Sequence, residues 1–134
     1  AGDIKSPIFR GGGRIFGPKP RTYTNKLNKK VRSLARKSAI SVKAGSGNLV
    51  VMEDFTFDAP KTKEFVNILS SLDLMGKKTL LVTGETDKQV YLSSRNIKNT
   101  SVASSSNICT YEIMHANTLI LSEGAVEKLS ALLA

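Results

Sequence analysis

The segment TLLVTGETDKQVYLSSRNIKNTSVAS at residues 79–104 decides the fold class, because it places a helical pattern between two strand patterns. The apolar run TLLVT at 79–83 predicts a buried strand, and TSVAS at 100–104 predicts a second strand. Between them, DKQVYLSSRNI at 87–97 predicts a short helix. Two strands joined by a crossover helix are the unit from which parallel sheets are built.

The same alternation continues on both sides of this segment. Further strand patterns are LVVMEDF at 49–55, which predicts a buried strand, and TLILS at 118–122; further helical patterns are KTKEFVNILSSLDLM at 61–75, ICTYEIMHA at 108–116 and EGAVEKLSALL at 123–133. We expect Asp58 and Pro60 to begin the helix at 61–75, and Ser122 to cap the last helix. Successive strands start 30, 21 and 18 residues apart, which leaves room for a crossover each time. The sequence therefore predicts an α/β layer sandwich with a mainly parallel, four-stranded sheet.

The positive charge is concentrated in the first third of the chain. The 134 residues carry a formal net charge of +9. Residues 1–44 contribute +11, from seven Lys and five Arg against Asp3, and residues 45–134 contribute −2, from eight basic and ten acidic residues. We interpret this as a basic arm joined to the nearly neutral body of one domain. Such a strong positive balance indicates an anionic partner.

The composition excludes several classes of protein. A hydrophobic fraction of 40% excludes a wholly disordered basic chain. No apolar run approaches the roughly 18 residues of a membrane-spanning helix, and the first residues, AGDIKSPIFR, contain no apolar signal-peptide core. The single cysteine, Cys109, excludes an internal disulfide and favours a reducing compartment. We therefore expect a cytoplasmic location and no membrane partner.

Residues 1–23 are predicted to be an extended basic segment, because Gly and Pro are too frequent there for a regular helix. Arg and Lys alternate in it with Phe9, Phe16 and Tyr23. Guanidinium groups bind phosphate oxygens, aromatic rings stack on unpaired bases, and a glycine run lets the backbone approach phosphates closely. The pattern predicts a nucleic-acid-binding loop. The alternative, a flexible basic tail, is usually richer in Lys and poorer in aromatic residues.

Residues 25–44 are predicted to form an amphipathic helix, with Thr24 or Asn25 as its N-cap and Gly45 ending it at a positive φ. At about 100° per residue, one side carries an apolar stripe made of Leu27, Val31, Leu34, Ala35, Ser38 and Val42. The opposite side is cationic, and no acidic residue occurs in this range. Ile40 breaks the pattern because it lies on the cationic side.

Four acidic residues lie at the carboxyl ends of predicted strands or just beyond them, at the edge where open parallel sheets bind ligands. They are Glu53, Asp54, Glu85 and Asp87. They suggest either a metal or acid–base site or, as we favour, caps for the helices that come next. No glycine-rich phosphate motif follows any of the predicted strands.

Cys109 and His115 are six positions apart and would point to opposite sides of a helix, so we expect no catalytic pair. We expect Cys109 to be a small buried residue and His115 to lie at a helix end. One His and one Cys are too few for a zinc site. We therefore predict that the chain is no enzyme, with no catalytic residue, no metal or other cofactor and no small-molecule substrate.

The stretch IKSPIFRGGGRIFGPKPR at 4–21 resembles the large-subunit ribosomal protein L-four family, of bacterial type. The pattern NKLNKKVRSLARKSAI at 25–40 is also similar to this family. Further similar motifs are VVMEDF, APKTK, LLVTGE, SSRNIKN and LILSEGAVEKL, at 50–55, 59–63, 80–85, 93–99 and 119–129. The resemblance covers nearly the whole chain, and the glycine-containing motif is its most specific part.

The resemblance implies a structural rRNA-binding protein of the large ribosomal subunit. It implies a Rossmann-like, three-layer α/β domain at residues 24–134, preceded at residues 1–23 by the returning half of an extended loop. The family's loop penetrates the rRNA and helps to line the peptide exit tunnel, and neighbouring large-subunit proteins are further partners. We predict that the RNA-binding residues are Lys5, Arg10, Gly11, Gly12, Gly13, Arg14, Phe16, Lys19, Arg21, Lys26, Lys29, Lys30, Arg32, Arg36 and Lys37.

Family members begin with a strand, a helix and the outgoing half of the loop. The resemblance therefore implies that these parts precede Ala1 and that the sheet lacks its first strand. Some bacterial members repress their own operon, so an RNA-binding repressor is an alternative function for the same basic surface. A small nucleotide-binding enzyme is a more remote alternative, because it would need a phosphate loop after a strand.

Overall fold

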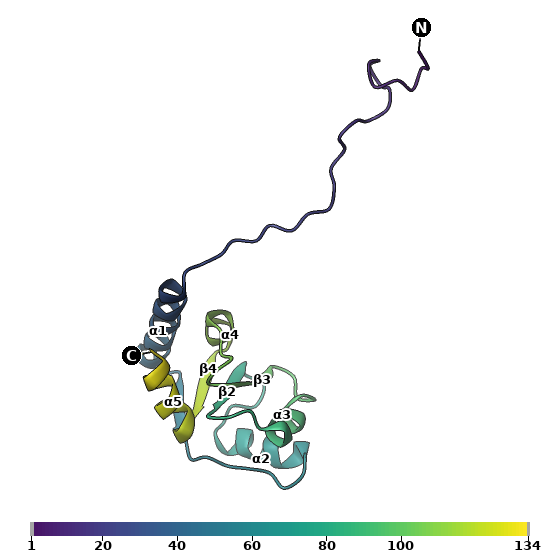
Figure 1. The fold of residues 1–134 in the computed structure, drawn as a ribbon. Helices are drawn as coiled ribbons and strands as arrows, with labels where there is room; N and C mark the ends of the chain where they lie inside the picture. Colours follow the sequence, from purple (N-terminus) through teal and green to yellow (C-terminus); the bar gives the residue numbers. More distant parts are fainter. Residues whose placement is uncertain (1, 134) are drawn as a thin grey trace.

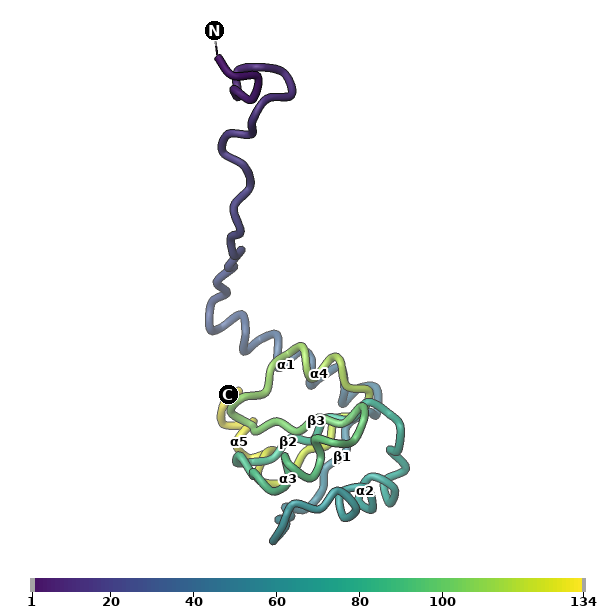
Figure 2. Tube along the Cα trace, turned by 90° about the vertical axis from the view of Figure 1, so that its right-hand side faces the viewer, coloured from purple at the N-terminus to yellow at the C-terminus, as the bar shows by residue number. Residues whose placement is uncertain are grey.

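The computed structural model describes residues 2–133, and Figure 1 shows a long arm that leads into an α/β body. The helices are α1 (Lys29–Gly45), α2 (Thr62–Ser71), α3 (Lys88–Ser94), α4 (Thr110–His115) and α5 (Glu123–Leu133). The strands are β1 (Leu49–Met52), β2 (Thr79–Thr83), β3 (Thr100–Ser104) and β4 (Thr118–Ser122). The tube in Figure 2, turned by 90°, shows the arm leaving the body from the start of α1.

Within the described residues the four strands form one sheet in the order β1-β4-β2-β3, and every neighbouring pair is parallel. The last strand, β4, lies between β1 and β2, so the register places Leu81 of β2 beside both Ile120 and Val102. The two central strands are buried along almost their whole length, which explains their continuous apolar sequence. The prediction of a mainly parallel α/β sheet is confirmed.

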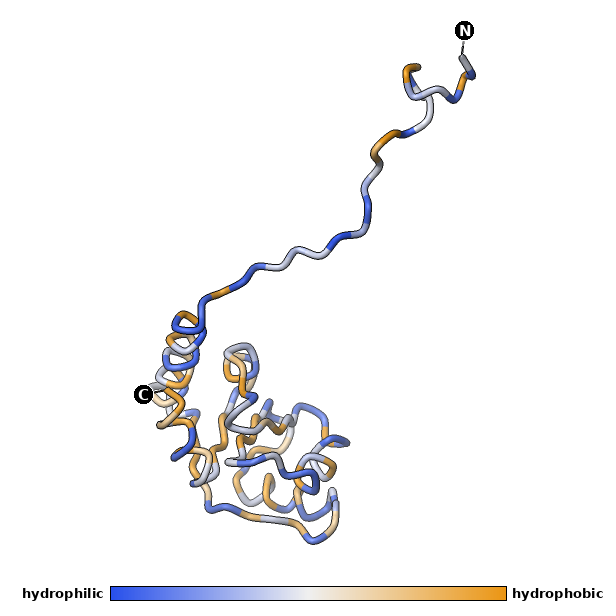
Figure 3. The backbone as a smooth tube through the Cα atoms, in the orientation of Figure 1, coloured by the Kyte–Doolittle hydropathy of each residue, from blue (hydrophilic) through white to orange (hydrophobic). Residues whose placement is uncertain are grey.

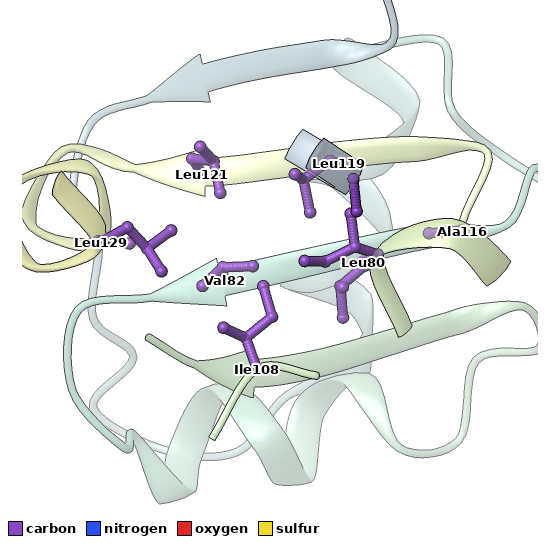
Figure 4. Packing of buried hydrophobic residues seen from close by; sticks show 10 residues of the cluster. Leu80, Val82, Ile108, Ala116, Leu119, Leu121 and Leu129 are labelled. Carbon is purple, nitrogen blue, oxygen red and sulfur yellow. The ribbon is translucent and has the colours of Figure 1, made fainter. Parts of the chain in front are cut away.

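Helices cover both faces of the sheet and bury two separate hydrophobic clusters. Alternate strand residues point to opposite faces, so Leu80 and Val82 belong to one cluster and Leu81 to the other. The first cluster, drawn in Figure 4, joins the sheet to α1, α4 and α5. The second joins it to α2 and α3, mainly through Phe65 and Val90. The domain therefore has three layers.

Four of the predicted elements have the expected bounds, and three helices are shorter than expected. β2, β3, β4 and α5 match their predicted ranges, whereas α2, α3 and α4 occupy only the middle of theirs. Asp87 caps α3, because its Oδ1 accepts a hydrogen bond from the Gln89 amide at 2.7 Å. The expected start of α2 at Asp58 and Pro60 is wrong, because the N-cap is Lys61.

The prediction of a buried strand at 49–55 is wrong in length and in burial. β1 ends at Met52, and the side chain of Val51 is 54% exposed. The physical reason is its position at the edge of the sheet, where it has a single neighbour, β4.

The bounds of α1 also differ from the prediction. The helix begins at Lys29 with Asn28 as N-cap, so Thr24 and Asn25 lie in the extended chain before it. Gly45 is its last helical residue, and the positive φ of 68° is found at Gly47 instead. The helix therefore ends one residue later than predicted, and Ser46 is its C-cap.

The helix α1 contacts the body through a different face from the one that its apolar stripe indicates. Ala39 is its buried residue, at 4% exposure, and Ile40 packs against the same cluster. Val31, Leu34 and Val42 of the predicted stripe are between 49% and 66% exposed. The small Ala39 side chain allows close approach of the helix to the body. Ile40, which broke the sequence pattern, thus marked the docked side.

Candidate nucleic-acid interface

The first part of the arm folds back on itself through backbone hydrogen bonds. The amide of Gly13 donates to the Lys5 carbonyl oxygen at 2.8 Å, and the amide of Gly12 donates to the Phe9 carbonyl oxygen at 3.0 Å. A Cβ atom added at Gly12 would overlap the carbonyl oxygen of Ser6, so no other residue fits there. We call residues 3–13 the hook. The glycine run therefore has a local structural purpose that sequence reasoning did not identify.

Beyond the hook, residues 14–28 contain no helix or strand, and their flat side chains are open to solvent. The ring of Phe16 is 99% exposed, and its backbone has a φ of 50°, in the left-handed region. The guanidinium of Arg21 lies 4.5 Å from the centre of the Tyr23 ring, and its Nη2 donates to the Tyr23 hydroxyl at 2.8 Å. These planes are suited to stacking on unpaired bases.

The positive charge of the arm has no carboxylate partner among residues 2–133. The ion pairs in this part of the chain are Lys61–Glu64 and Lys128–Glu85, and both lie on the body. Hydrophilic residues predominate along the arm in Figure 3, with short apolar spots between them. The predicted basic residues of the arm are all exposed, namely Lys5, Arg10, Arg14, Lys19, Arg21 and Lys26. The last of these lies before α1, not on the helix as predicted.

The basic residues of α1 are not equally accessible. Lys29, Lys30, Arg32 and Lys37 are exposed. Arg36 is only half-exposed, because it lies one helical turn before Ala39, on the side that packs against the body. Its contribution to a binding surface is therefore smaller than that of its neighbours. Lys43, farther along the same side, donates from Nζ to the carbonyl oxygen of Ala116 and is committed to the body.

A second candidate site is the hollow of about 460 Å³ at the carboxyl ends of the central strands. The first amides of a helix often bind phosphate at such a place. Here the amide of Gly124, in the first turn of α5, donates to Oδ2 of Asp54 at 3.0 Å. A carboxylate of the chain thus occupies the position where an anion would bind. Two of the four carboxylates at this edge, Asp54 and Asp87, act as helix caps, as we favoured, although Asp54 caps α5 and not the helix that follows it.

Beside this hollow, Glu85 and Lys128 form an ion pair at 2.8 Å. The hydrogen bond from the Lys128 ammonium, together with its positive charge, holds the pKa of Glu85 below its ordinary value. Both side chains are well exposed, so water screens the pair. The pair joins the β2–α3 loop to α5 and offers no free group for chemistry.

The expectation that Cys109 is buried is wrong, because its side chain is exposed at the N-cap of α4. His115 is the last residue of α4, as predicted. Within residues 2–133, no group of three or more His, Cys, Asp and Glu side chains is arranged to hold a metal ion. In the same range no helix combines the length and the apolar character needed to cross a membrane.

The sequence motifs, the basic arm and the α/β body together match one known family. The model of the family described as "Ribosomal protein L4/L1 family" matches residues 1–132. The chain belongs to this family. The resemblance of the 4–21 motif to the L-four family is thereby confirmed.

Curated relatives in this family carry the name "Large ribosomal subunit protein uL4". The protein of Flavobacterium johnsoniae is 54% identical over 127 residues, which are 95% of this chain and 61% of that protein. That of Flavobacterium psychrophilum is 55% identical with the same coverage. That of Cytophaga hutchinsonii is 54% identical over 133 residues, 99% of this chain and 64% of that protein. The chain thus spans about three fifths of the length of these relatives.

One exposed aromatic surface of this L-four family member was missed by sequence reasoning. The rings of Tyr111 and His115 stack on the outside of α4, with centres 5.4 Å apart and planes 9° from parallel. The spacing of four residues between two ring-bearing side chains is the signal that could have found it, since i and i+4 lie on one helix face.

Proposed function

We propose that the chain is a structural component of the large ribosomal subunit and that it binds large-subunit rRNA. Binding takes place through the arm and the exposed cations of α1, and neighbouring large-subunit proteins complete its surroundings. The location is cytoplasmic and ribosome-associated. The family name and the printed names of the relatives support this proposal.

The observation that carries the proposal is the concentration of unpaired positive charge. Residues 1–44 hold twelve basic residues against one acid, while the body is close to neutral. Like charges at this density repel one another unless an anion lies between them. A polyanion with many phosphates meets this condition, and the exposed rings of Phe16 and Tyr23 add stacking on unpaired bases.

Under the same proposal the arm threads between rRNA helices, and the family's loop helps to line the peptide exit tunnel. An extended chain spans up to roughly 3.3 Å per residue, so the arm is long enough to reach well into a folded RNA. Its hook lies at the inner end of the arm, where the close backbone contact at Gly12 keeps the turn tight.

The test is the salt dependence of binding to large-subunit rRNA of Flavobacterium johnsoniae, the source of a relative 54% identical. If the arm neutralises about six phosphates, affinity should fall roughly a thousandfold between 50 and 200 mM salt. A triple variant, Arg10→Gln, Arg14→Gln and Arg21→Gln, should weaken binding and flatten this dependence.

The matched control removes the same charge from the body, with Lys63→Gln, Lys88→Gln and Arg95→Gln. These residues are exposed on or beside α2 and α3, so rRNA affinity should change little. A salt-independent affinity, or equal losses in the two triple variants, would contradict the proposal. Binding of mononucleotides in the hollow at the carboxyl ends of the central strands would instead favour an enzyme.

A further inference from the structure

We propose a second RNA contact, on the outer face of α4, where an unpaired rRNA base stacks on Tyr111. We define the α4 platform as Tyr111, Met114 and His115 together with Lys78. This inference rests on the proposed rRNA binding and assigns to it a surface of the body that neither the arm nor α1 provides.

The exposed side chains of Tyr111 and Met114 form the apolar part of the platform, and the fold does not need them for its own packing. The core contact of α4 is made by Ile113, which is fully buried. Tyr111 is 72% exposed and Met114 is 52% exposed on the other side of the helix. The His115 ring stacks against one face of the Tyr111 ring, which leaves the other face for a base.

Cationic and polar groups flank the stacked rings. Nζ of Lys78 lies 3.1 Å from Nε2 of His115, and the ammonium keeps other donors free for a phosphate. A hollow of about 310 Å³ next to the stack is lined by Lys78, Asn99, Ser101, Glu112 and His115 among others. Its acid, Glu112, accepts a hydrogen bond from the Cys109 amide at Oε2, which orients the carboxylate along α4.

The α4 platform lies at the same end of the body as the arm. Figure 1 shows α4 beside α1, and the bond from Lys43, in the last turn of α1, to the carbonyl oxygen of Ala116, the C-cap of α4, joins the ends of the two helices. Lys29 and Arg32, three residues apart at the start of α1, are exposed and share one side of the helix. An RNA held by these cations therefore passes close to α4.

Charge complementarity favours RNA over a protein as the occupant. The charged groups that line the hollow beside the rings are Lys78 and Glu112, and Glu112 already accepts a hydrogen bond from the Cys109 amide. An exposed aromatic ring beside a cation is the pattern of single-stranded nucleic-acid sites. A protein segment would need apolar groups opposite the rings and acidic groups opposite the cations. We therefore commit to an unpaired base with its flanking phosphate.

The chain contains no tryptophan, so a single Trp can report on this surface alone. In the Tyr111→Trp variant of the full chain, addition of Flavobacterium johnsoniae large-subunit rRNA should strongly quench Trp fluorescence, because a base stacks on the indole. The matched control is Tyr91→Trp. Tyr91 is 49% exposed on α3, which packs on the other face of the sheet, so its Trp fluorescence should stay unchanged.

A second measurement is the rRNA affinity of Tyr111→Ala. The loss of one stacked base should weaken binding roughly fivefold or more, whereas Tyr91→Ala should bind like the unsubstituted chain. Because Tyr111 is 72% exposed, the variant should keep its thermal midpoint, which separates a binding loss from unfolding.

The outcomes distinguish this inference from the proposed function. If the unsubstituted chain binds rRNA but Tyr111→Trp behaves like Tyr91→Trp, the platform is not an RNA contact and the rRNA role stands. If the fluorescence of the Tyr111→Trp variant shifts only on addition of large-subunit proteins without rRNA, the surface belongs to a protein contact and the inference is overturned. If the unsubstituted chain shows no rRNA binding, both proposals fail.

Discussion

The carboxylate of Asp54 caps a helix that begins 69 residues later in the sequence, because its Oδ2 accepts the amide hydrogen of Gly124 at 3.0 Å. A Cβ atom at Gly124 would lie 2.8 Å from the same oxygen. The end of β1 and the start of α5 are therefore joined at the edge of the sheet where many α/β proteins bind anions.

Replacing Asp54 with Ala should lower the free energy of unfolding by about 1 kcal/mol, the usual cost of losing an N-terminal cap. Urea denaturation checks this as a lower midpoint with an unchanged slope. The control is Asp58→Ala, an exposed carboxylate in the loop before α2. Equal midpoints for the two variants would show that the Asp54–Gly124 bond does not stabilise the fold.

Replacing Gly84 with Ala should destabilise the domain by about 1–3 kcal/mol, because the site is overpacked. An added Cβ would lie 3.0 Å from the carbonyl carbon of Gly124, which is backbone and yields little. The control is Gly45→Ala in α1, where no atom lies within 4 Å of the added Cβ. That change should be neutral or stabilising by up to about 1 kcal/mol. Thermal unfolding of both variants gives the comparison, and a stable Gly84→Ala protein would contradict it.

Two substitutions in α1 test which side of the helix is docked. Ile40→Ala should reduce the free energy of unfolding by about 1–2 kcal/mol, since Ile40 packs against the first cluster. Leu34→Ala should change it by less than about 0.5 kcal/mol, because Leu34 is 66% exposed. Chemical denaturation of the two proteins is the measurement. The reverse order would mean that the apolar stripe, and not Ile40, faces the body.

The ion pair of Glu85 predicts a small pH dependence. Since the pKa of Glu85 is lowered in the folded state, mainly by the Lys128 hydrogen bond, its stabilising effect is present above the ordinary Glu pKa. The effect disappears as the pH falls through the lowered pKa. NMR titration of the Glu85 carboxyl carbon should show a higher midpoint in Lys128→Met than in the unsubstituted chain. An unchanged midpoint would show that the pair does not form in solution.

Limited proteolysis tests whether RNA covers the arm. Trypsin should cut the free chain after Arg10, Arg14 and Arg21, because these residues are exposed in a segment without helix or strand. Bound large-subunit rRNA should slow cleavage at all three positions, while cleavage after the exposed Lys61, before α2 on the body, continues. Mass spectrometry of the fragments identifies the sites. Unchanged cleavage of the arm at saturating rRNA would count against burial of the arm in RNA.

The two central strands could be predicted because each one is a continuous run of mostly apolar residues in the sequence. TLLVT and TLILS are apolar throughout, since both faces of β2 and β4 are covered by helices, and their bounds agree with the structure. The cap of α3 was also local, because Asp87 lies within three residues of the amides it accepts from. The RNA-binding residues stay predictions, and so does the boundary between a loop at 1–23 and a domain at 24–134. The first residue of that loop, Ala1, and the last residue of that domain, Ala134, lie outside the described residues.

The sequence by itself determined the segregation of charge, the family and the alternation of strands and helices, because each is written in neighbouring residues. Only the tertiary structure decided which side of α1 faces the body. The small Ala39 side chain packs into the first hydrophobic cluster, whereas most of the longer apolar stripe has no part of the body opposite it. It also decided that Asp54 caps α5. These relationships depend on partners brought together from distant parts of the chain, and a local pattern carries no record of them.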